Sequence, residues 1–204
     1  MKVLIALMVL ALAIPAFAGE NPSVRAFVTM DPAGYVHADP AAVSGSVYDV
    51  YLCFDCFGEP SVEGDGGLTG VSLVLDFLCG GFTAGPQDLT IFHPSAATVV
   101  GGPDNIVDGW VVAAPECVVP GPLDIICVAK IPWYYLGPGE ILILPSPVDG
   151  KATVDCNNDL DFFCVLSHGA LGQGVQTPGD ADCDCEPPNA VENSTWGTIK
   201  SLYR

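Results

Sequence analysis

Residues Thr69–Leu78 have the sequence TGVSLVLDFL, an almost unbroken apolar run rich in Val and Leu. A run of this kind without helical periodicity predicts a central β-strand that is covered on both faces. Ser46–Phe54 (SVYDVYLCF) carries β-branched and aromatic residues throughout, which favours a second long strand. These two stretches place the chain in the all-β class.

Short apolar runs separated by Gly and Pro turns continue this pattern from Asn21 to Pro178. Roughly eight or nine short strands with such turns predict a two-sheet antiparallel β-sandwich, Ig-like or jelly-roll in type. The glycine-rich segment 169–174 is expected to be a loop. Besides the two stretches above, the expected strands are Val24–Met30, Ala97–Val100, Trp110–Ala114, Leu123–Trp133, Ile141–Leu144, Ala152–Val154 and Phe162–Leu166.

The N-terminus has the features of a secretory signal peptide, residues 1–18. Lys2 precedes an apolar run, Val3–Phe17, and Ala16-Phe17-Ala18 provides a small-x-small cleavage site before Gly19. The run is shorter than the ~20 residues that a membrane-spanning helix needs. We therefore expect a secreted, extracellular or cell-surface protein with no membrane span.

Composition divides the rest of the chain into three parts. A β-sandwich domain is expected at 19–178, an acidic, cysteine-containing linker at 179–190, and an amphipathic tail at 191–204. The apolar residues of the tail share one face of a predicted short C-terminal helix: Trp196, Ile199, Leu202 and Tyr203.

The chain is strongly acidic, with 24 Asp and Glu against 6 Lys and Arg and a net charge of −18. Such a surface is unfavourable for nucleic acid and for anionic membranes. It suits solubility, divalent cations or a basic partner. The partners that we expect are other protein chains, including further copies of this one, or glycans.

The nine cysteines are expected to be mostly disulfide-bonded in an oxidising compartment. The odd number leaves one thiol, for which Cys79 in an apolar strand suits the role of a buried small hydrophobe. Cys53-Phe54-Asp55-Cys56 is a C-x-x-C, but no helix follows it, which favours structural disulfides over a redox or zinc site. If strands pair around Pro122, Cys117 faces Cys127, and Cys156 and Cys164 similarly bracket a polar turn; both pairs are disulfide candidates.

Oxygen-bearing side chains alternate along one acidic segment. They are Asp155, Asn157, Asp159 and Asp161, a spacing found in calcium-binding loops. The Gly and Glu that an EF-hand needs are replaced by Leu160 and Leu166. The segment therefore predicts either a solvated acidic turn or a calcium site that is not an EF-hand, and calcium is the one cofactor considered.

No arrangement of residues in the sequence indicates catalysis. The three histidines are isolated, and neither a G-x-S-x-G nor an H-E-x-x-H is present. Trp133, Tyr134 and Tyr135 form an aromatic cluster of which one or two members are expected to face outward, and with Trp196 they are candidate contacts to a ligand or partner.

Val47–Phe54, Leu68–Phe77 and Leu123–Ile131 resemble, in their order and character, strands of cohesin-like exported β-sandwiches. The ending STWGTIKSLYR is similar to a W-G-x-I-K-x-L-Y-R tail found on exported β-sandwich proteins of environmental bacteria. There the tail looks like a sorting or assembly element. The resemblance implies bacterial export to the surface or the outside.

These observations predict a non-enzymatic β-sandwich that acts in binding or in extracellular assembly, as an adhesin, a surface-layer component or a filament subunit. A carbohydrate-binding module using the aromatic cluster is the first alternative. A secreted hydrolase with scattered carboxylates is the second.

Overall fold

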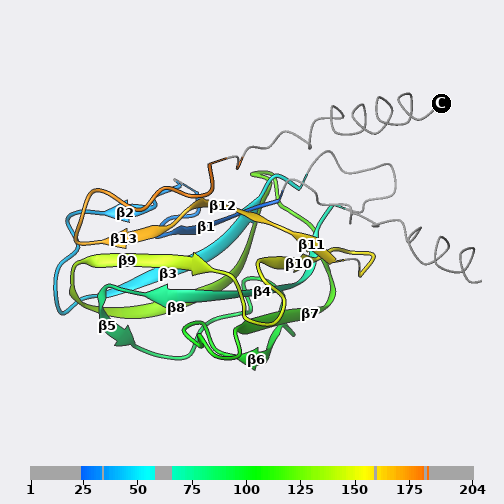
Figure 1. Ribbon diagram of the computed structural model, residues 1–204, viewed down its shortest axis with the longest axis horizontal. Helices are drawn as coiled ribbons and strands as arrows, with labels where there is room; N and C mark the ends of the chain where they lie inside the picture. The colour runs from blue at the N-terminus through cyan, green and yellow to red at the C-terminus, as the bar shows by residue number, and fades with distance from the viewer. Residues whose placement is uncertain (1–23, 34, 58–65, 159, 182, 184–204) are drawn as a thin grey trace, which may run out of the picture.

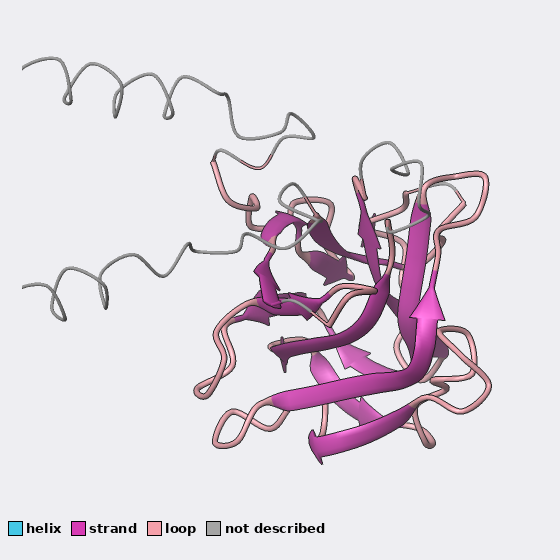
Figure 2. Ribbon diagram, turned by 90° about the vertical axis from the view of Figure 1, so that its right-hand side faces the viewer, coloured by secondary structure: helices cyan, strands magenta, loops and turns pink. Residues whose placement is uncertain are grey.

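The computed structural model describes residues 24–33, 35–57, 66–158, 160–181 and 183. Within these residues the chain consists of strands and loops, without helices (Figure 2). The strands form two sheets, which confirms the predicted all-β sandwich. The expected signal peptide, the C-terminal helix and Trp196 lie outside the described residues.

The first sheet has five strands in the order β12-β1-β3-β8-β5 (Figure 1). Its long members are β3 and β8, which pair over almost the whole length of β3. The five strands are β1 (Arg25–Thr29), β3 (Val47–Asp55), β5 (Gly80–Thr83), β8 (Ile125–Gly137) and β12 (Cys164–Ser167).

The second sheet has eight strands and is organised around β4 (Leu68–Phe77). β4 pairs with β7 on one edge, and with β10 and β9 at successive positions along its length. The other members are β2 (Ala38–Asp39), β6 (Ala97–Gly101), β7 (Trp110–Val118), β9 (Gly139–Leu144), β10 (Ala152–Val154), β11 (Leu160–Phe162) and β13 (Gly169–Leu171).

The core lies between the inner faces of the two sheets. Val50, Leu52 and Phe54 of β3 alternate inward from the first sheet, and all three are fully buried. From the second sheet Leu73 and Leu75 project toward them. The period-2 alternation of large side chains along each long strand therefore builds one continuous core.

The sheets contain elements that the sequence pattern did not predict. β1 pairs with β12, and β2 with β13, in parallel rather than antiparallel fashion. β13 lies inside the glycine-rich segment that was expected to be a loop, so that prediction was wrong. Gly169 allows close packing at the start of β13, because a Cβ at this position would lie 2.5 Å from Cγ1 of Val28.

The disulfide pairing predicted from the sequence was also wrong. Cys117 is bonded to Cys156 and Cys127 to Cys53, while Cys164 is bonded to Cys183. The prediction assumed a hairpin around Pro122, but β7 and β8 belong to different sheets, so this turn crosses between the layers.

The remaining cysteines of the described residues agree with the sequence prediction. Cys56 is disulfide-bonded, and Cys53 is bonded to Cys127, so the C-x-x-C is part of the disulfide framework. Cys79 is free and buried, and its burial raises the pKa of the thiol to about 11. The three disulfides that join pairs of described cysteines are consistent with an oxidising location.

The predicted linker begins close to the sandwich. The N–H of Asp180 donates to the carbonyl of Val165, and the Asp180 carboxylate bonds Lys151. With the Cys164–Cys183 disulfide, these contacts hold residues 180 and 183 against β12. No helix of the described residues has the length and apolar character required to cross a bilayer.

Close packing at β13 gives a test of this architecture. We expect Gly169→Ala to destabilise the protein by about 1–3 kcal/mol, because the new methyl group collides with Val28 in a packed core. Gly121→Ala is the control, since a Cβ there has no neighbour within 4 Å. Chemical denaturation measures both; an equal, small change for the two variants would contradict the placement of β13 beneath β1.

Candidate functional site

The aromatic triplet of β8 divides between the two faces of its sheet. Trp133 and Tyr135 are buried in the core, where Trp133 stacks on Phe77 with ring centroids 4.2 Å apart. Tyr134 projects to the opposite, outer face and stacks on Phe82 of β5 at 5.0 Å. Only this middle residue of the predicted cluster is therefore placed to meet a ligand.

The second sheet has an unusual outer face, which we call the apolar face. The strand registers align two rows of side chains across β11, β10, β4, β7 and β6. Antiparallel sheets in two-layer proteins normally turn polar residues toward solvent, whereas these rows hold one hydroxyl and no charge. One row is Leu160, Val154, Gly70, Ala113 and Ala97; the other is Phe162, Ala152, Ser72, Val111 and Val100.

The middle of the apolar face is hollowed. A depression of about 350 Å³ lies over β10, β4 and β7, within the size range of pockets that bind ligands or side chains. Its floor is made by small residues at consecutive cross-strand positions, Gly70, Ser72, Ala113 and Ala152. Asp149 lies at its edge, where its carboxylate accepts a hydrogen bond from Ser72 Oγ at 3.1 Å.

Large exposed side chains border this hollow. Leu160 and Phe162 of β11 are 51% and 66% exposed, and Val100 of β6 is 40% exposed on the far side. Small residues in the centre and bulky ones at the margin form a concave apolar surface. Contiguous surfaces of this kind mark sites of protein or ligand binding.

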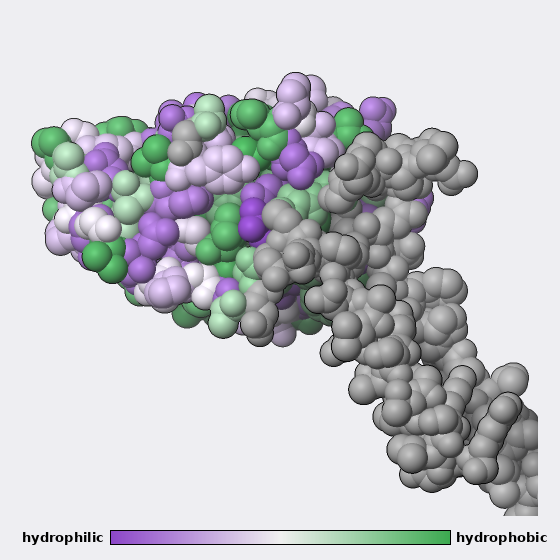
Figure 3. Space-filling model, turned by 90° about the horizontal axis from the view of Figure 1, so that it is seen from above, coloured by the Kyte–Doolittle hydropathy of each residue, from purple (hydrophilic) through white to green (hydrophobic). Residues whose placement is uncertain are grey.

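The outer face of the first sheet is chemically different. It carries the ion pairs Arg25–Asp55 and Lys130–Asp49 as well as the Phe82–Tyr134 stack. Hydrophobic and hydrophilic residues are likewise intermingled on the side of the molecule drawn in Figure 3. The apolar face is therefore a local feature of one sheet.

All lysines and arginines of the described residues are neutralised by the protein itself. Arg25 pairs with Asp55, Lys130 with Asp49, and Lys151 with Asp180. The last two basic residues of the sequence, Lys200 and Arg204, belong to the predicted tail. The folded body thus presents an excess of negative charge, which attracts basic partners.

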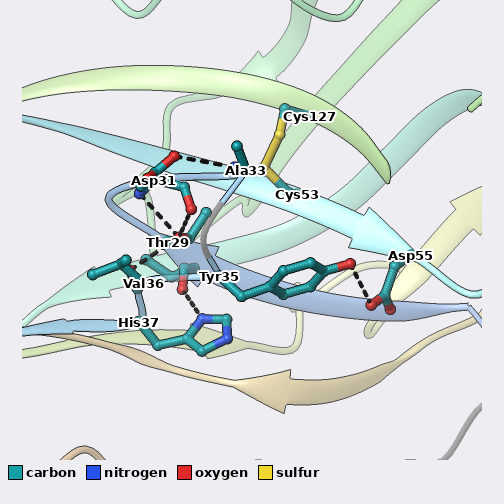
Figure 4. Close-up of a disulfide and its surroundings, with 10 residues drawn as sticks. Thr29, Asp31, Ala33, Tyr35, Val36, His37, Cys53, Asp55 and Cys127 are labelled. Atoms are coloured by element: carbon teal, nitrogen blue, oxygen red, sulfur yellow. Dashed lines mark hydrogen bonds between the residues drawn. A yellow bond between two sulfur atoms is a disulfide. The ribbon is translucent and has the colours of Figure 1, made fainter. Parts of the chain in front are cut away.

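A polar cluster lies at the end of β3, on the outer face of the first sheet. Arg25 donates two hydrogen bonds to Asp55, at 2.9 and 2.8 Å. Tyr35, in the loop that follows β1, stacks on Phe27 and directs its hydroxyl toward Asp55 (Figure 4). Backbone N–H groups of Cys56 and Phe57 donate to the nearby Asp124.

Backbone strain is concentrated in this polar cluster. Tyr35, Cys56 and Asp124 have φ values of 50°, 62° and 55°, in the left-handed region that side chains normally disfavour. Burial, and then the charge of Asp55, raise the pKa of both Tyr35 and Asp124. Strain and shifted pKa values are common at functional sites, but structural ion-pair networks shift pKa values as well.

The histidines have structural partners. His37 Nδ1 contacts the carbonyl of Val28 at 2.7 Å, and His168 Nδ1 accepts the N–H of Ile143 at 3.0 Å. Ser167 Oγ donates to the carbonyl of His168 rather than to an imidazole nitrogen. This is not the geometry of a nucleophile activated by a base.

Three of the predicted calcium ligands, Asp155, Asn157 and Asp161, lie in the β10–β11 hairpin and differ in burial. Asp155 and Asp161 are buried, whereas Asn157 is exposed and donates its backbone N–H to Asp155 Oδ1 at 2.8 Å. Asp159 lies outside the described residues. Among the residues that the structure describes, no three His, Cys, Asp or Glu side chains are grouped so as to hold a metal ion.

Comparison with known proteins gives no relative from which a function could be transferred. No protein-family model matches the chain, and neither the curated proteins nor the solved structures include a match. The candidate sites therefore depend on their own geometry.

The apolar face and the polar cluster were both missed by reasoning from the sequence. The apolar face combines residues from five strands, and only strand pairing places them in rows. An alternating small–large pattern in Gly70-Val71-Ser72-Leu73 is present in the sequence, however, and indicates that one side of β4 is open to contact.

Asp55→Asn tests the polar cluster. We expect a loss of about 3 kcal/mol in the free energy of unfolding, because Arg25 loses its buried anionic partner. Asp49→Asn is the control, since the Lys130–Asp49 pair is more exposed and longer, at 3.7 Å, and its loss is expected to cost less than about 0.5 kcal/mol.

The same variant changes the titration of Asp124. Asp55→Asn removes a negative charge, so the pKa of Asp124, measured by NMR, should fall toward its ordinary value while burial keeps it somewhat raised. Because folding raises this pKa, the contribution of Asp124 to stability is greatest at acid pH and decreases as the pH rises through the raised value. An unchanged Asp124 titration in the variant would contradict this coupling.

Proposed function

We propose that the protein is a non-enzymatic, extracellular binding and assembly module whose apolar face docks a segment of another protein chain. The observation that carries the proposal is the concave apolar surface itself, with its small-residue floor and the exposed Leu160 and Phe162 at its margin. An exposed apolar surface is stabilised when a partner covers it.

Charge and shape define the chemistry of the partner. The lysines and arginines of the described body are already paired, so an incoming segment gains most if it supplies positive charge together with bulky apolar side chains. An aromatic side chain is the preferred anchor for a hollow of about 350 Å³.

The C-terminal segment 191–204 of a second copy has this composition. Its sequence, VENSTWGTIKSLYR, combines Trp196 and other apolar residues with Lys200 and Arg204. Docking of one chain's tail on the apolar face of the next copy is a heterologous contact, which generates open filaments or closed rings. The proposal thus accounts for both the acidic body and the basic tail.

The binding experiment uses a fluorescently labelled peptide of residues 191–204 and the protein shortened after residue 190. We expect saturable binding that weakens at least tenfold in Phe162→Asp and Leu160→Asp, since both place charge at the margin of the apolar face. Val47→Asp is the matched control, because Val47 is similarly exposed but belongs to the first sheet. Equal affinities for all three variants would contradict docking on the apolar face.

The assembly state tests the identity of the partner. The mature full-length chain should form higher oligomers as its concentration rises in sedimentation velocity, whereas the shortened chain and Phe162→Asp remain monomeric. A full-length protein that stays monomeric up to the millimolar range would overturn assembly through a second copy.

Glycan binding is the second candidate function, and the Phe82–Tyr134 stack favours it. Phe82 is more than half exposed, and the Tyr134 hydroxyl lies near Gly45, where an added Cβ would be 3.6 Å away. An apolar ring surface next to a hydroxyl is suited to stacking on a sugar. Glycan-array signals should disappear in Tyr134→Ala and Phe82→Ala and persist in Phe162→Asp; an array without signal for the wild type removes this candidate.

A further inference from the structure

The hollow of the apolar face has a polar corner. Ser72 of β4 belongs to its floor, and the Ser72 Oγ donates a hydrogen bond to Asp149 Oδ2 at 3.1 Å. Ser72 is only 6% exposed, whereas Asp149 is exposed at the edge of the hollow. The rest of the floor consists of Gly70, Ala113 and Ala152, so a ligand can form side-chain hydrogen bonds at the floor only in this corner.

This corner accepts hydrogen bonds but has no donor to offer. A serine hydroxyl carries a single hydrogen, and that of Ser72 is directed to Asp149, whose carboxylate has acceptors only. Thr69, the other hydroxyl that lines the hollow, donates to backbone carbonyls at the end of β10. The remaining polar residue of the lining, Asn158, is exposed at the β10–β11 turn. A side chain that binds in the corner must therefore bring its own donor.

The loop between β9 and β10 holds the Asp149 carboxylate in place. Ser146 and Gly150 exchange two backbone hydrogen bonds across this loop, at 2.8 and 3.0 Å. Ser146 Oγ also accepts the N–H of Val148 at 3.3 Å, and Gly150 has a φ of 75°, which glycine adopts without strain. Because the acceptor is fixed before a ligand arrives, binding loses little further conformational entropy.

An indole has the shape and the hydrogen-bonding capacity that this hollow requires. Its ring is large, flat and apolar, and its single N–H donates and does not accept. A phenylalanine ring has no donor, and a tyrosine hydroxyl adds an acceptor oxygen for which the corner has no donor. A lysine ammonium donates as well, but its flexible stem leaves the apolar floor uncovered.

We propose that the Asp149–Ser72 pair selects an indole side chain for the hollow, and that the occupant is Trp196 of a second copy. This inference rests on the tail docking proposed above and names the residues that recognise the anchor. The segment 191–204 contains two aromatic residues, Trp196 and Tyr203, and of these only Trp196 has a ring that donates without accepting. The two basic residues of the same segment complement the acidic body, so charge favours the same occupant.

The experiment is a double-mutant cycle on binding of the tail. The acceptor is the mature full-length chain carrying Trp196→Ala, which removes the anchor from its own tail. The ligands are the labelled peptide of residues 191–204 and a peptide in which benzothienylalanine replaces Trp196. This residue has the size of tryptophan but carries sulfur in place of the indole N–H.

We expect the benzothienylalanine peptide to bind about tenfold more weakly than the wild-type peptide, because it cannot donate to a charged acceptor. When the acceptor chain also carries Asp149→Ala, the two peptides should bind with equal affinity. Removal of one negative charge weakens both peptides alike, so the cycle isolates the contact between the indole and Asp149.

Two controls test whether the effect belongs to this contact. Asp49→Asn removes a negative charge from the first sheet, and the chain that carries it should keep the full preference for the indole. A Tyr203→Phe peptide loses the hydroxyl of the other aromatic residue, and it should bind each acceptor chain as the wild-type peptide does. In NMR spectra of a peptide with a nitrogen-labelled indole, the N–H signal should move to lower field on binding, and Asp149→Ala should remove this shift.

The outcomes separate this inference from the docking proposal. Equal binding of the wild-type and benzothienylalanine peptides, or an indole preference that survives Asp149→Ala, would overturn the inference and leave the docking proposal intact. Coupling of Asp149 to Tyr203→Phe instead of to the indole would do the same. If no peptide binds, the docking proposal itself fails, and the inference with it. Asp149 is an exposed loop residue and the other changes lie in the peptide, so the folded core is left unaltered.

Discussion

Hydrogen bonding along both edges of β4 is the constraint on which the rest of the structure depends. β7 occupies one edge, and β10 and β9 are paired at successive positions along its length, so the strand joins all parts of the larger sheet. Its alternation then produces two different surfaces. Leu73 and Leu75 face the core, whereas Gly70 and Ser72 face outward and leave room above them. The core and the hollow are thus two sides of the same strand.

The fold class could be predicted from local sequence, because strand formation in this chain follows apolar runs and turn residues. The pairing partner of each strand could not be predicted, since the apolar pattern of a strand does not say to which of the two sheets the strand belongs. Pro120-Gly121-Pro122 is typical of a hairpin, yet the chain crosses there from one sheet to the other, and the disulfides change accordingly. Gly169 shows the converse case, a glycine that permits close packing of a strand and was interpreted as a loop residue.

The candidate sites likewise include one feature that the local sequence predicts and one that it does not. Period-2 alternation alone predicts that the middle residue of Trp133-Tyr134-Tyr135 faces the opposite side of the sheet from its two neighbours. The structure places it there. By contrast, nothing in the sequence indicates that Thr153 lies opposite Asp161; this follows only from the register of β10 and β11. Strand pairing decides which residues become neighbours, and it cannot be read from the spacing of residues along one segment.

The disulfide between Cys164 and Cys183 has a mechanical consequence. Arg25, at the start of the first described strand, is paired with Cys164, so the two ends of the described fold leave the sandwich at the same corner. Force applied through the two termini would act across that corner and would largely bypass the body of the sandwich. In a fibre of the kind proposed above, the module would project to one side of the fibre axis, and the docked surfaces would carry the tension. Closely spaced ends also make the module suitable for insertion into a surface loop of another protein.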